Sequence, residues 1–324
     1  MGWQCGSKPK AVAVTGWGSG IRLGRRSGLG QGAGVRVLIL GCGYVGLPLA
    51  AELVRQGHEV VGVRRTAEGA GELLAAGVIP AVGDVTQPES LRGLPGPFDW
   101  VVNTVSSSKG GAEVYRSVYV EGMRNLIAWL AGSGVRKFIY TSSTSVYAQT
   151  DGSEVTEESA AEPPAETGRL LVETENLLRA AVRDRGFPAV VLRVSGIYGP
   201  ERGHLLQQFL RDEARISGDG SRWLNMVHRD DVVGAAIAAL ERGVPGRIYN
   251  VTDDEPVTQL GFLQWLAGQL RKPLPPLASP EESAARKRGV THKRVSNQRL
   301  REELAFRLRY PTFREGYAVE LLRR

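Results

Sequence analysis

Cysteine is scarce in this chain, with only Cys5 and Cys42 among 324 residues. Two cysteines exclude a disulfide framework and a cysteine-based zinc site. The four histidines are widely scattered, so we expect no metal site. No apolar run approaches the roughly 18 to 20 residues that a membrane-spanning helix needs, and no signal peptide is recognisable. We therefore expect a cytoplasmic protein with no membrane partner.

Acidic residues are missing from one end of the chain and few at the other. Residues 1–34 contain five basic residues and no acidic one, whereas residues 285–324 contain twelve basic and four acidic residues. Because the formal net charge is +7, the stretch between them carries −6. Aromatic residues make up only 7% of the chain, and no stacking pattern accompanies the basic ends. A solvated tail and a solvated helical surface explain these ends better than a nucleic-acid groove, so we expect no nucleic-acid partner.

Residues 1–34 have little apolar periodicity and contain ten glycines. Such a stretch cannot bury enough surface to offset its ordering entropy, so we predict a flexible Gly-rich extension. The run Ala11–Gly16, followed by further glycines, resembles a strand feeding a glycine turn. Arginines and glycines occupy the place where a helix should follow, so we interpret this run as a decoy.

From Val35 the chain alternates between strand and helix patterns. Val35–Leu40 is a nearly continuous apolar run, typical of a strand buried on both faces. Further strands are predicted at Glu59–Val63, Val78–Val82, Trp100–Thr104, Lys137–Thr141 and Ala189–Val194, with helices near 67–76, 112–131 and 167–185. This alternation predicts an α/β fold with a Rossmann-type doubly wound parallel sheet, and we interpret residues 35–194 as an NAD(P)-binding domain.

The pattern loosens in residues 195–324. Helices are predicted near 204–215, 231–240 and 258–270, a strand at Arg247–Val251, and short basic helices at the end. We interpret this stretch as a smaller mixed α/β substrate-binding region, with some segments returning to the Rossmann sheet.

A glycine-rich turn, Gly41-Cys42-Gly43-Tyr44-Val45-Gly46, follows the first predicted strand and opens a helix. The first glycine permits the tight turn, the second lets the main chain approach a pyrophosphate, and the third allows close packing of helix on strand. In this context the pattern indicates a dinucleotide site, and we expect Gly41, Gly43, Tyr44, Val45 and Gly46 to contact the cofactor. The alternative is a tight turn without a ligand.

The second predicted strand ends in Arg64 and Arg65, where NAD-binding chains usually offer a carboxylate to the ribose. Guanidinium groups suit a 2′-phosphate better than a neutral diol. We therefore predict NADP rather than NAD as the cofactor. The alternative is that one or both arginines point into solvent.

Further motifs resemble those of the extended short-chain dehydrogenase/reductases, the NAD-dependent epimerase/dehydratase superfamily. They lie in the right order over residues 35–324: Gly83-Asp84-Val85, Val105-Ser106, Phe138–Tyr147, Arg193–Pro200, Asn225–Asp231 and Tyr249–Pro256. The resemblance implies that Asp84 and Val85 lie by the adenine, that Val105 and Ser106 line the cofactor, and that Gly196 belongs to the loop beside the nicotinamide. It also implies that Ser143 holds the catalytic Ser/Thr position.

The chain departs from this family at the catalytic pair, a Tyr and a Lys four residues later, commonly followed by Glu after four more. Aligning that Glu with Glu175 puts Thr167 and Leu171 at the two positions, and aligning it with Glu173 puts Ala165 and Arg169 there. No Tyr occurs from residue 148 to 197 and no Lys from 138 to 271, so no register restores the pair. The chain resembles an atypical member.

The missing pair leaves the proton donor open. Thr167 occupies the family Tyr position, but an aliphatic hydroxyl titrates too high to act alone as a general acid or base. Tyr147 could face the pocket, although a packing role is the plainer interpretation. Tyr198, His204 and His228 are further candidates, with a structural role as the plainer interpretation of each. Lys109 is another, with a solvated loop position as its plainer interpretation. Asp231 is expected to cap the helix that follows it.

These observations predict an NAD(P)-dependent oxidoreductase or epimerase/dehydratase-like protein with a non-standard catalytic site. Hydride would move between the nicotinamide and a small polar substrate, while Ser143 holds the substrate oxygen. The resemblance implies nucleotide sugars as the commonest substrate class of the family. The alternative is a non-catalytic NADP(H)-binding redox sensor or scaffold. A small molecule is the expected partner, and a homodimer is left open.

Overall fold

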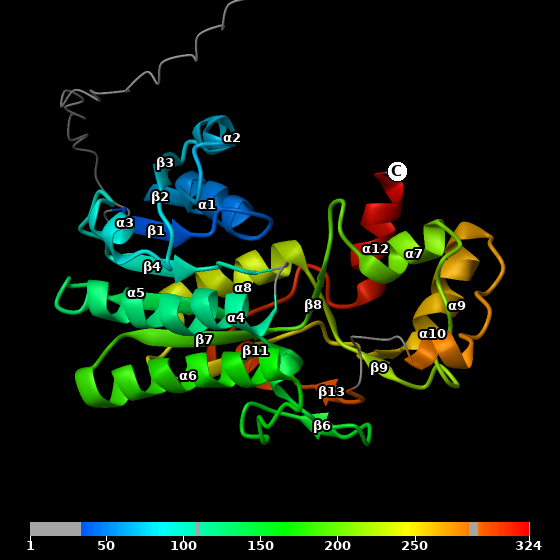
Figure 1. Cartoon of the computed structure of the whole chain (residues 1–324). Coiled ribbons are helices and arrows are strands. Elements are labelled where there is room, and N and C mark those ends of the chain that lie inside the picture. The colour runs from blue at the N-terminus through cyan, green and yellow to red at the C-terminus, as the bar shows by residue number, and fades with distance from the viewer. Residues whose placement is uncertain (1–33, 108–110, 285–290, 324) are drawn as a thin grey trace, which may run out of the picture. The chain divides into compact units, whose positions relative to one another are not determined.

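A computed structural model describes residues 34–107, 111–284 and 291–323 of the chain (Figure 1). The predicted extension 1–34 lies outside the described residues except for Gly34, as does the candidate Lys109. Contacts divide the chain into residues 1–33 and residues 34–324, and the following description concerns the second unit.

Seven parallel strands form the central sheet, in the order β11-β7-β5-β4-β1-β2-β3. They are β1 (Arg36–Leu40), β2 (Glu59–Arg64), β3 (Ile79–Val82), β4 (Trp100–Asn103), β5 (Lys137–Ser143), β7 (Ala189–Val194) and β11 (Ile248–Val251). The predicted doubly wound parallel sheet is confirmed. Strand order reverses beside β1, which pairs with β2 on one side and β4 on the other. In open α/β sheets ligands bind at the carboxyl ends of the strands at such a point.

The helices of this part are α1 (Gly46–Arg55), α2 (Ala70–Ala75), α3 (Pro88–Arg92), α4 (Ala112–Tyr115), α5 (Gly122–Leu130), α6 (Glu166–Arg185) and α8 (Arg229–Arg242). Successive residues of β1 alternate between two hydrophobic clusters. Val37 and Ile39 pack in the cluster that includes α1 and α8, whereas Leu38 and Leu40 pack in the one that includes α5 and α6. Both faces of the sheet are therefore covered, which explains the uninterrupted apolar run in the sequence.

Among the described residues, the C-terminal part forms two small two-stranded sheets of its own and a third with β6 (Glu154–Val155), which precedes α6 in the chain. They pair β8 (Gly196–Tyr198) with β10 (Met226–His228), β9 (Trp223–Leu224) with β12 (Val257–Thr258), and β6 with β13 (Arg294–Val295). The helices are α7 (His204–Leu210), α9 (Gln259–Leu270), α10 (Pro280–Ala284), α11 (Gln298–Glu303) and α12 (Phe313–Leu322). Strand β11 also comes from this part, yet it pairs with β7 in the central sheet. The predicted domain boundary at residue 194 stays a prediction.

The helix predicted near 112–131 is present over Ala112–Leu130, with a π-helical stretch at Arg116–Glu121 between α4 and α5. Two local predictions were wrong. The helix predicted near 204–215 ends at Leu210, shortly before Asp212 takes a left-handed φ of 59°. Asp231 does not cap α8. His228 is the N-cap residue, because its Nδ1 accepts from the Asp230 amide, and the Asp231 carboxylate instead accepts from the amides of Arg309 and Tyr310.

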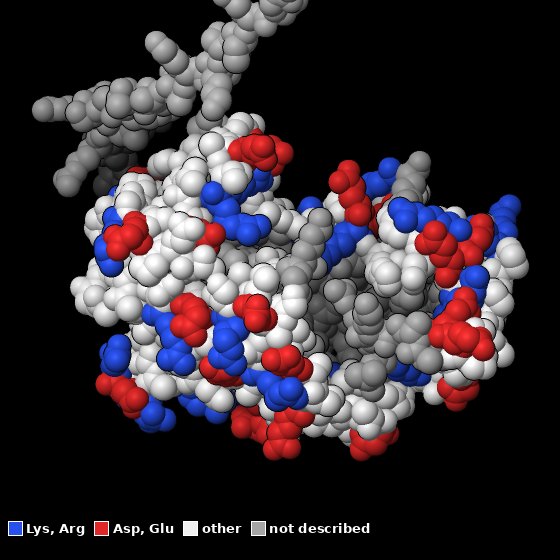
Figure 2. Space-filling view, viewed as in Figure 1, with Lys and Arg blue, Asp and Glu red and all other residues white. Residues whose placement is uncertain are grey.

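Charged side chains of both signs are interspersed over the face drawn in Figure 2. Within the described residues, no helix combines the length and apolar character needed to cross a membrane. Nor does any cluster of three or more His, Cys, Asp or Glu side chains suited to a metal ion occur in that part of the chain.

Candidate functional site

The glycine turn lies between the end of β1 and the start of α1, where the strand order reverses. The amides of Gly41 and Cys42 donate to the Val63 carbonyl at 3.1 and 3.0 Å. From the other side, Thr104 Oγ1 lies 3.0 Å from the Leu40 carbonyl and 2.9 Å from that of Gly41. The ends of β2 and β4 therefore hold the turn in place. The sequence did not predict Thr104, because this contact depends on the strand order.

Two glycines of the turn, Gly41 and Gly46, leave no room for a side chain. Gly41 has a φ of 85°, and a Cβ there would lie 2.8 Å from the Val105 nitrogen. A Cβ on Gly46 would lie 2.4 Å from the Gly41 carbonyl oxygen. At Gly43 a Cβ would meet nothing closer than 3.9 Å, so bare main chain borders open space. This arrangement fits a pyrophosphate at the start of α1.

Tyr44 connects the turn to the loop after β8. Its hydroxyl donates to the Pro200 carbonyl at 3.1 Å, and the guanidinium carbons of Arg202 and Arg229 lie 4.9 and 5.3 Å from its ring centroid. Burial raises the pKa of Tyr44 to about 12, so the phenol stays neutral. Val45 packs against the cluster that contains α1.

The two arginines after β2 differ. Arg64 Nε donates to the Cys42 carbonyl at 2.8 Å, and its Nη2 forms an ion pair with Glu72 at 2.7 Å. Gly69 makes room for this guanidinium, since a Cβ there would lie 1.6 Å from Arg64 Nη1. Arg64 therefore lies against the glycine turn with Glu72 as its ion-pair partner, and its contact with a 2′-phosphate stays a prediction. Arg65 is exposed, which agrees with the alternative that one of the two arginines points into solvent.

The acidic loop after β3 uses its polar groups locally. Asp84 Oδ1 accepts from the Thr86 amide and hydroxyl at 2.9 and 2.8 Å. Val85 is buried, and its carbonyl accepts from Asn125 Nδ2 at 3.0 Å. The structure thus gives both residues a role in shaping this loop, and their contact with an adenine stays a prediction.

The remaining residues expected to line the cofactor or to lie beside the nicotinamide are found at two strand ends, after β4 and at the start of β8. Val105 follows β4 and is half-buried, with its amide 3.1 Å from Asn103 Oδ1, and Ser106 next to it is exposed. Gly196 begins β8 and is also exposed, and its amide donates to the Asn225 carbonyl at 3.1 Å. Their contact with a cofactor stays a prediction.

Ser143 is the last residue of β5, paired with Val194 of β7. Its Oγ accepts from the Ser145 amide at 3.1 Å, and Ser143 thereby caps the short 3₁₀ turn Thr144–Val146. Because the amide occupies one lone pair, the hydroxyl proton is left to donate elsewhere. Ser143 is half-buried and can hold a substrate oxygen in this way.

Tyr147 is fully buried, and protein groups occupy its hydroxyl. The phenol lies 2.8 Å from Asn250 Oδ1 and accepts from Arg193 Nη1 at 2.9 Å. Burial raises its pKa. The packing interpretation describes this residue, and we withdraw Tyr147 as a proton donor.

A buried ion pair connects α6 to the sheet. Arg193 Nη2 lies 2.6 Å from Glu175 Oε2, with 3% and 2% of the two side chains exposed, and Ser142 Oγ donates to Glu175 Oε1 at 2.6 Å. Glu173 instead pairs with Arg116 near the surface. The burial of Glu175 favours the register that aligns it with the family Glu.

In that register Thr167 and Leu171 face inward. Thr167 is half-buried, and Leu171 is buried in a cluster with Val146, Tyr147, Val155 and Val295. In this register an apolar side chain would take the place that the resemblance gives to the family Lys, and the altered catalytic pair stays a prediction. Neither residue offers a group that titrates near neutral pH.

The remaining candidates have structural surroundings. His228 is fully buried, its Nε2 lies 3.4 Å from Glu320 Oε1, and burial lowers its pKa. Tyr198 stacks on Tyr317 with ring centroids 4.2 Å apart. His204 is exposed at the start of α7.

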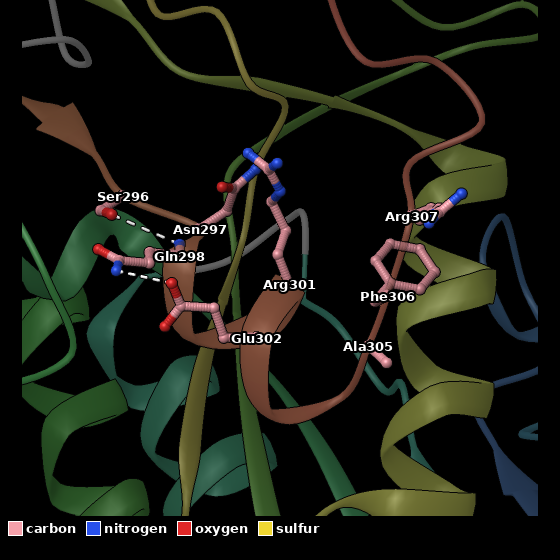
Figure 3. Close-up of a pocket in the computed structure, with 8 residues that line it drawn as sticks. All are labelled: Ser296, Asn297, Gln298, Arg301, Glu302, Ala305, Phe306 and Arg307. Carbon is pink, nitrogen blue, oxygen red and sulfur yellow. Dashed lines mark hydrogen bonds between the residues drawn. The ribbon is translucent and has the colours of Figure 1, made fainter.

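A cavity of about 600 Å³ lies at α11 (Figure 3), where Arg301 and Asn297 both contact Asp254 Oδ1, at 3.3 and 2.8 Å. Its lining consists of Ser296, Asn297, Gln298, Arg301, Glu302, Ala305, Phe306 and Arg307. The glycine turn and Ser143 do not line it. We therefore assign the candidate site from the turn and the strand ends rather than from this cavity.

Comparisons with known proteins agree with this geometry. Residues 37–252 match the model of the NAD dependent epimerase/dehydratase family. Protein YeeZ of Escherichia coli (strain K12) is 27% identical over 283 residues, which cover 85% of this chain and 96% of that protein. The 3-diazoavenalumate denitrifying reductase of Streptomyces sp is 28% identical over 88% of this chain and 100% of its own length. The structure of a putative NAD-dependent epimerase/dehydratase from Methylobacillus flagellatus has a TM-score of 0.69 and 32% identity, covering 90% of this chain and 99% of that one.

Proposed function

Because the chain belongs to the NAD-dependent epimerase/dehydratase family, we propose that it is an NADP(H)-linked reductase of a small polar acceptor such as a carbonyl compound. The observation that carries this proposal is the Arg64 guanidinium, held 2.8 Å from the Cys42 carbonyl beside the open main chain of Gly43. A cation at this place complements a 2′-phosphate. The reductase of Streptomyces, similar over its whole length, supports the direction of the reaction.

The missing pair favours reduction over epimerisation or dehydration. Those reactions begin by removing a proton from a substrate hydroxyl, which needs a general base at the reacting carbon. Thr167 and Leu171 supply none. Reduction of an electron-poor acceptor needs a proton only as negative charge develops on the acceptor, and water can provide it.

The chain's own groups have distinct roles in this proposal. The bound nicotinamide cofactor supplies the hydride. The glycine turn holds the diphosphate through main-chain donors, and Arg64 holds the additional phosphate. The Ser143 hydroxyl donates a hydrogen bond to the acceptor oxygen or nitrogen while one of its lone pairs accepts from the Ser145 amide at 3.1 Å, and water supplies the transferred proton. This bond strengthens as charge develops on the acceptor.

Hydride transfer tests the proposal directly. Loss of the NADPH absorbance is followed with a panel of aldehydes, quinones, diazo compounds and nucleotide sugars, using the full-length chain and Ser143→Ala. We expect turnover with at least one acceptor and a loss of about 10²-fold in Ser143→Ala, the size of one lost transition-state hydrogen bond. Ser133→Ala, an exposed serine between α5 and β5, is the control. Binding of NADPH without turnover on any acceptor would favour the redox sensor or scaffold instead.

Three statements about the protein's surroundings stay predictions: that it is cytoplasmic, that it can form a homodimer, and that it has no nucleic-acid partner. Heparin retention that is lost when residues 1–34 and 285–324 are removed would contradict the last of them.

A further inference from the structure

Lys293 is a buried cation without a carboxylate partner. It precedes β13 and is 3% exposed. Its Nζ donates to the Tyr147 main-chain carbonyl at 2.9 Å and to Thr291 Oγ1 at 3.1 Å. No Asp or Glu oxygen forms an ion pair with it among residues 34–107, 111–284 and 291–323. Holding an ammonium on two neutral acceptors is costly, and such groups gather at functional sites.

The carbonyl that Lys293 binds belongs to the turn that begins at Ser143. At one end of this turn Ser143 Oγ accepts from the Ser145 amide, and at the other the Tyr147 amide donates to the Thr144 carbonyl at 3.2 Å. Lys293 therefore holds the far end of a five-residue segment whose first member is the candidate substrate-binding hydroxyl. Residues 143–147 would lose one fixed end without it.

The same C-terminal segment also packs where the family lysine is missing. Val295, two residues after Lys293, lies in the buried cluster with Leu171 and Tyr147. Arg193, another cation near Tyr147, is neutralised by Glu175 at 2.6 Å. Within the described part of the chain, the ammonium of Lys293 is therefore a positive charge on this side of the turn that forms no ion pair.

We propose that Lys293 is a positioning residue for the reaction at Ser143, which fixes the turn of residues 143–147 and provides behind it the positive charge that α6 lacks. This inference rests on the proposed reductase function. Lys293 lies outside the predicted nucleotide-binding domain of residues 35–194, so the C-terminal segment would contribute to the reaction at Ser143.

The charge of Lys293 changes in an accessible pH range. Burial lowers its pKa to about 8. The nearest ionisable group is Tyr147, whose ring centroid lies 6.0 Å from Lys293 Nζ. Arg193 donates to the Tyr147 hydroxyl, and Glu157 lies near the same phenol. His292 and Arg294 precede and follow Lys293 in the chain. Above pH 8 the ammonium becomes a neutral amine. Hydride transfer should therefore decline as the pH rises through this value.

The first experiment compares pH profiles of hydride transfer from NADPH to phenanthrenequinone by the full-length chain. Lys293→Met should lose about tenfold in kcat, a barrier change of about 1.4 kcal/mol, and show no decline near pH 8. Lys293→Arg should restore most of the rate and keep it above pH 9, because guanidinium stays charged. Lys137→Met is the matched control, since Lys137 also donates to a main-chain carbonyl, that of Gly243, but at the opposite end of β5.

The second experiment needs no turnover. Hydrogen–deuterium exchange of residues 143–147 in the full-length chain without nucleotide should become about tenfold faster in Lys293→Met and stay unchanged in Lys137→Met. Unchanged exchange in Lys293→Met overturns the proposal, and so does a Lys293→Arg enzyme that still declines at pH 8. If the wild-type chain reduces no acceptor, the reductase function fails, while faster exchange in Lys293→Met still supports the positioning of the turn.

Discussion

The glycine turn and the turn after β5 lie at the carboxyl ends of strands in one sheet, but they differ in what they preserve. The first has its three glycines, two of which leave no room for a side chain because a Cβ would meet main-chain atoms at 2.4 to 2.8 Å, and a cation beside it. The second keeps Ser143, while Thr167 and Leu171 stand on α6 in the register set by the buried Glu175. In the proposed function, nucleotide binding and proton transfer therefore depend on separate parts of the sheet, and one can change without the other.

The largest expected effect is the loss of folding stability when the buried ion pair between Arg193 and Glu175 is broken. Arg193→Met would leave the Glu175 carboxylate buried without its cation and remove a donor from the Tyr147 hydroxyl. Breaking such a pair typically costs about 3 to 5 kcal/mol of the free energy of unfolding. Urea denaturation measures it. Arg183→Met, which removes an exposed pair with Asp184, should leave the midpoint nearly unchanged, and an equal loss in both variants would contradict the account.

The next effect concerns the glycine turn alone. Gly46→Val would place a branched side chain where even a Cβ lies 2.4 Å from the Gly41 carbonyl oxygen, so the turn must open. We expect NADPH affinity to fall by about 100-fold or more, equivalent to about 2.7 kcal/mol, in calorimetric titrations. Gly71→Ala on α2, where a Cβ would meet nothing within 4 Å, is the control. Wild-type affinity in Gly46→Val would show that the turn does not bind the nucleotide.

A smaller effect separates the two arginines after β2. Arg64→Ala should weaken NADPH binding about tenfold, or about 1.4 kcal/mol, with little effect on NADH, because it removes the cation beside the turn. Arg65→Ala should alter neither, since Arg65 is exposed. Equal losses for NADPH and NADH in Arg64→Ala would mean that Arg64 only shapes the turn through its bond to Cys42.

The smallest effect is the pH dependence of stability at Lys293. Its pKa is lowered from 10.5 to about 8 in the folded chain, so between these values the unfolded chain binds the additional proton. The free energy of unfolding should therefore rise with pH through this window, with a slope of at most about 1.4 kcal/mol per pH unit. Lys293→Met should lack this rise when denaturation is measured from pH 7.5 to 10.5, whereas Lys137→Met should keep most of it. Parallel curves for the wild-type chain and Lys293→Met would contradict the burial of the charge.

The sequence predicted the parts that depend on short-range patterns. Apolar runs such as Val35–Leu40 identify strands covered on both faces, and the spacing Gly41–Gly46 identifies the turn. It did not predict the pairs β6–β13 and β9–β12, because strands of two residues have no periodicity. It also missed Lys293, which lies 146 residues from Tyr147 in the chain. Such contacts depend on the tertiary fold.

The most direct test of the account is calorimetric titration of the full-length wild-type chain with NADPH and, separately, with NADH. The account predicts one site per chain and an affinity for NADPH about tenfold or more above that for NADH, because Arg64 adds a charge-assisted bond to the 2′-phosphate. Equal or reversed affinities would contradict the assignment of Arg64. Absence of binding by both nucleotides at saturating concentrations would contradict the assignment of the glycine turn itself.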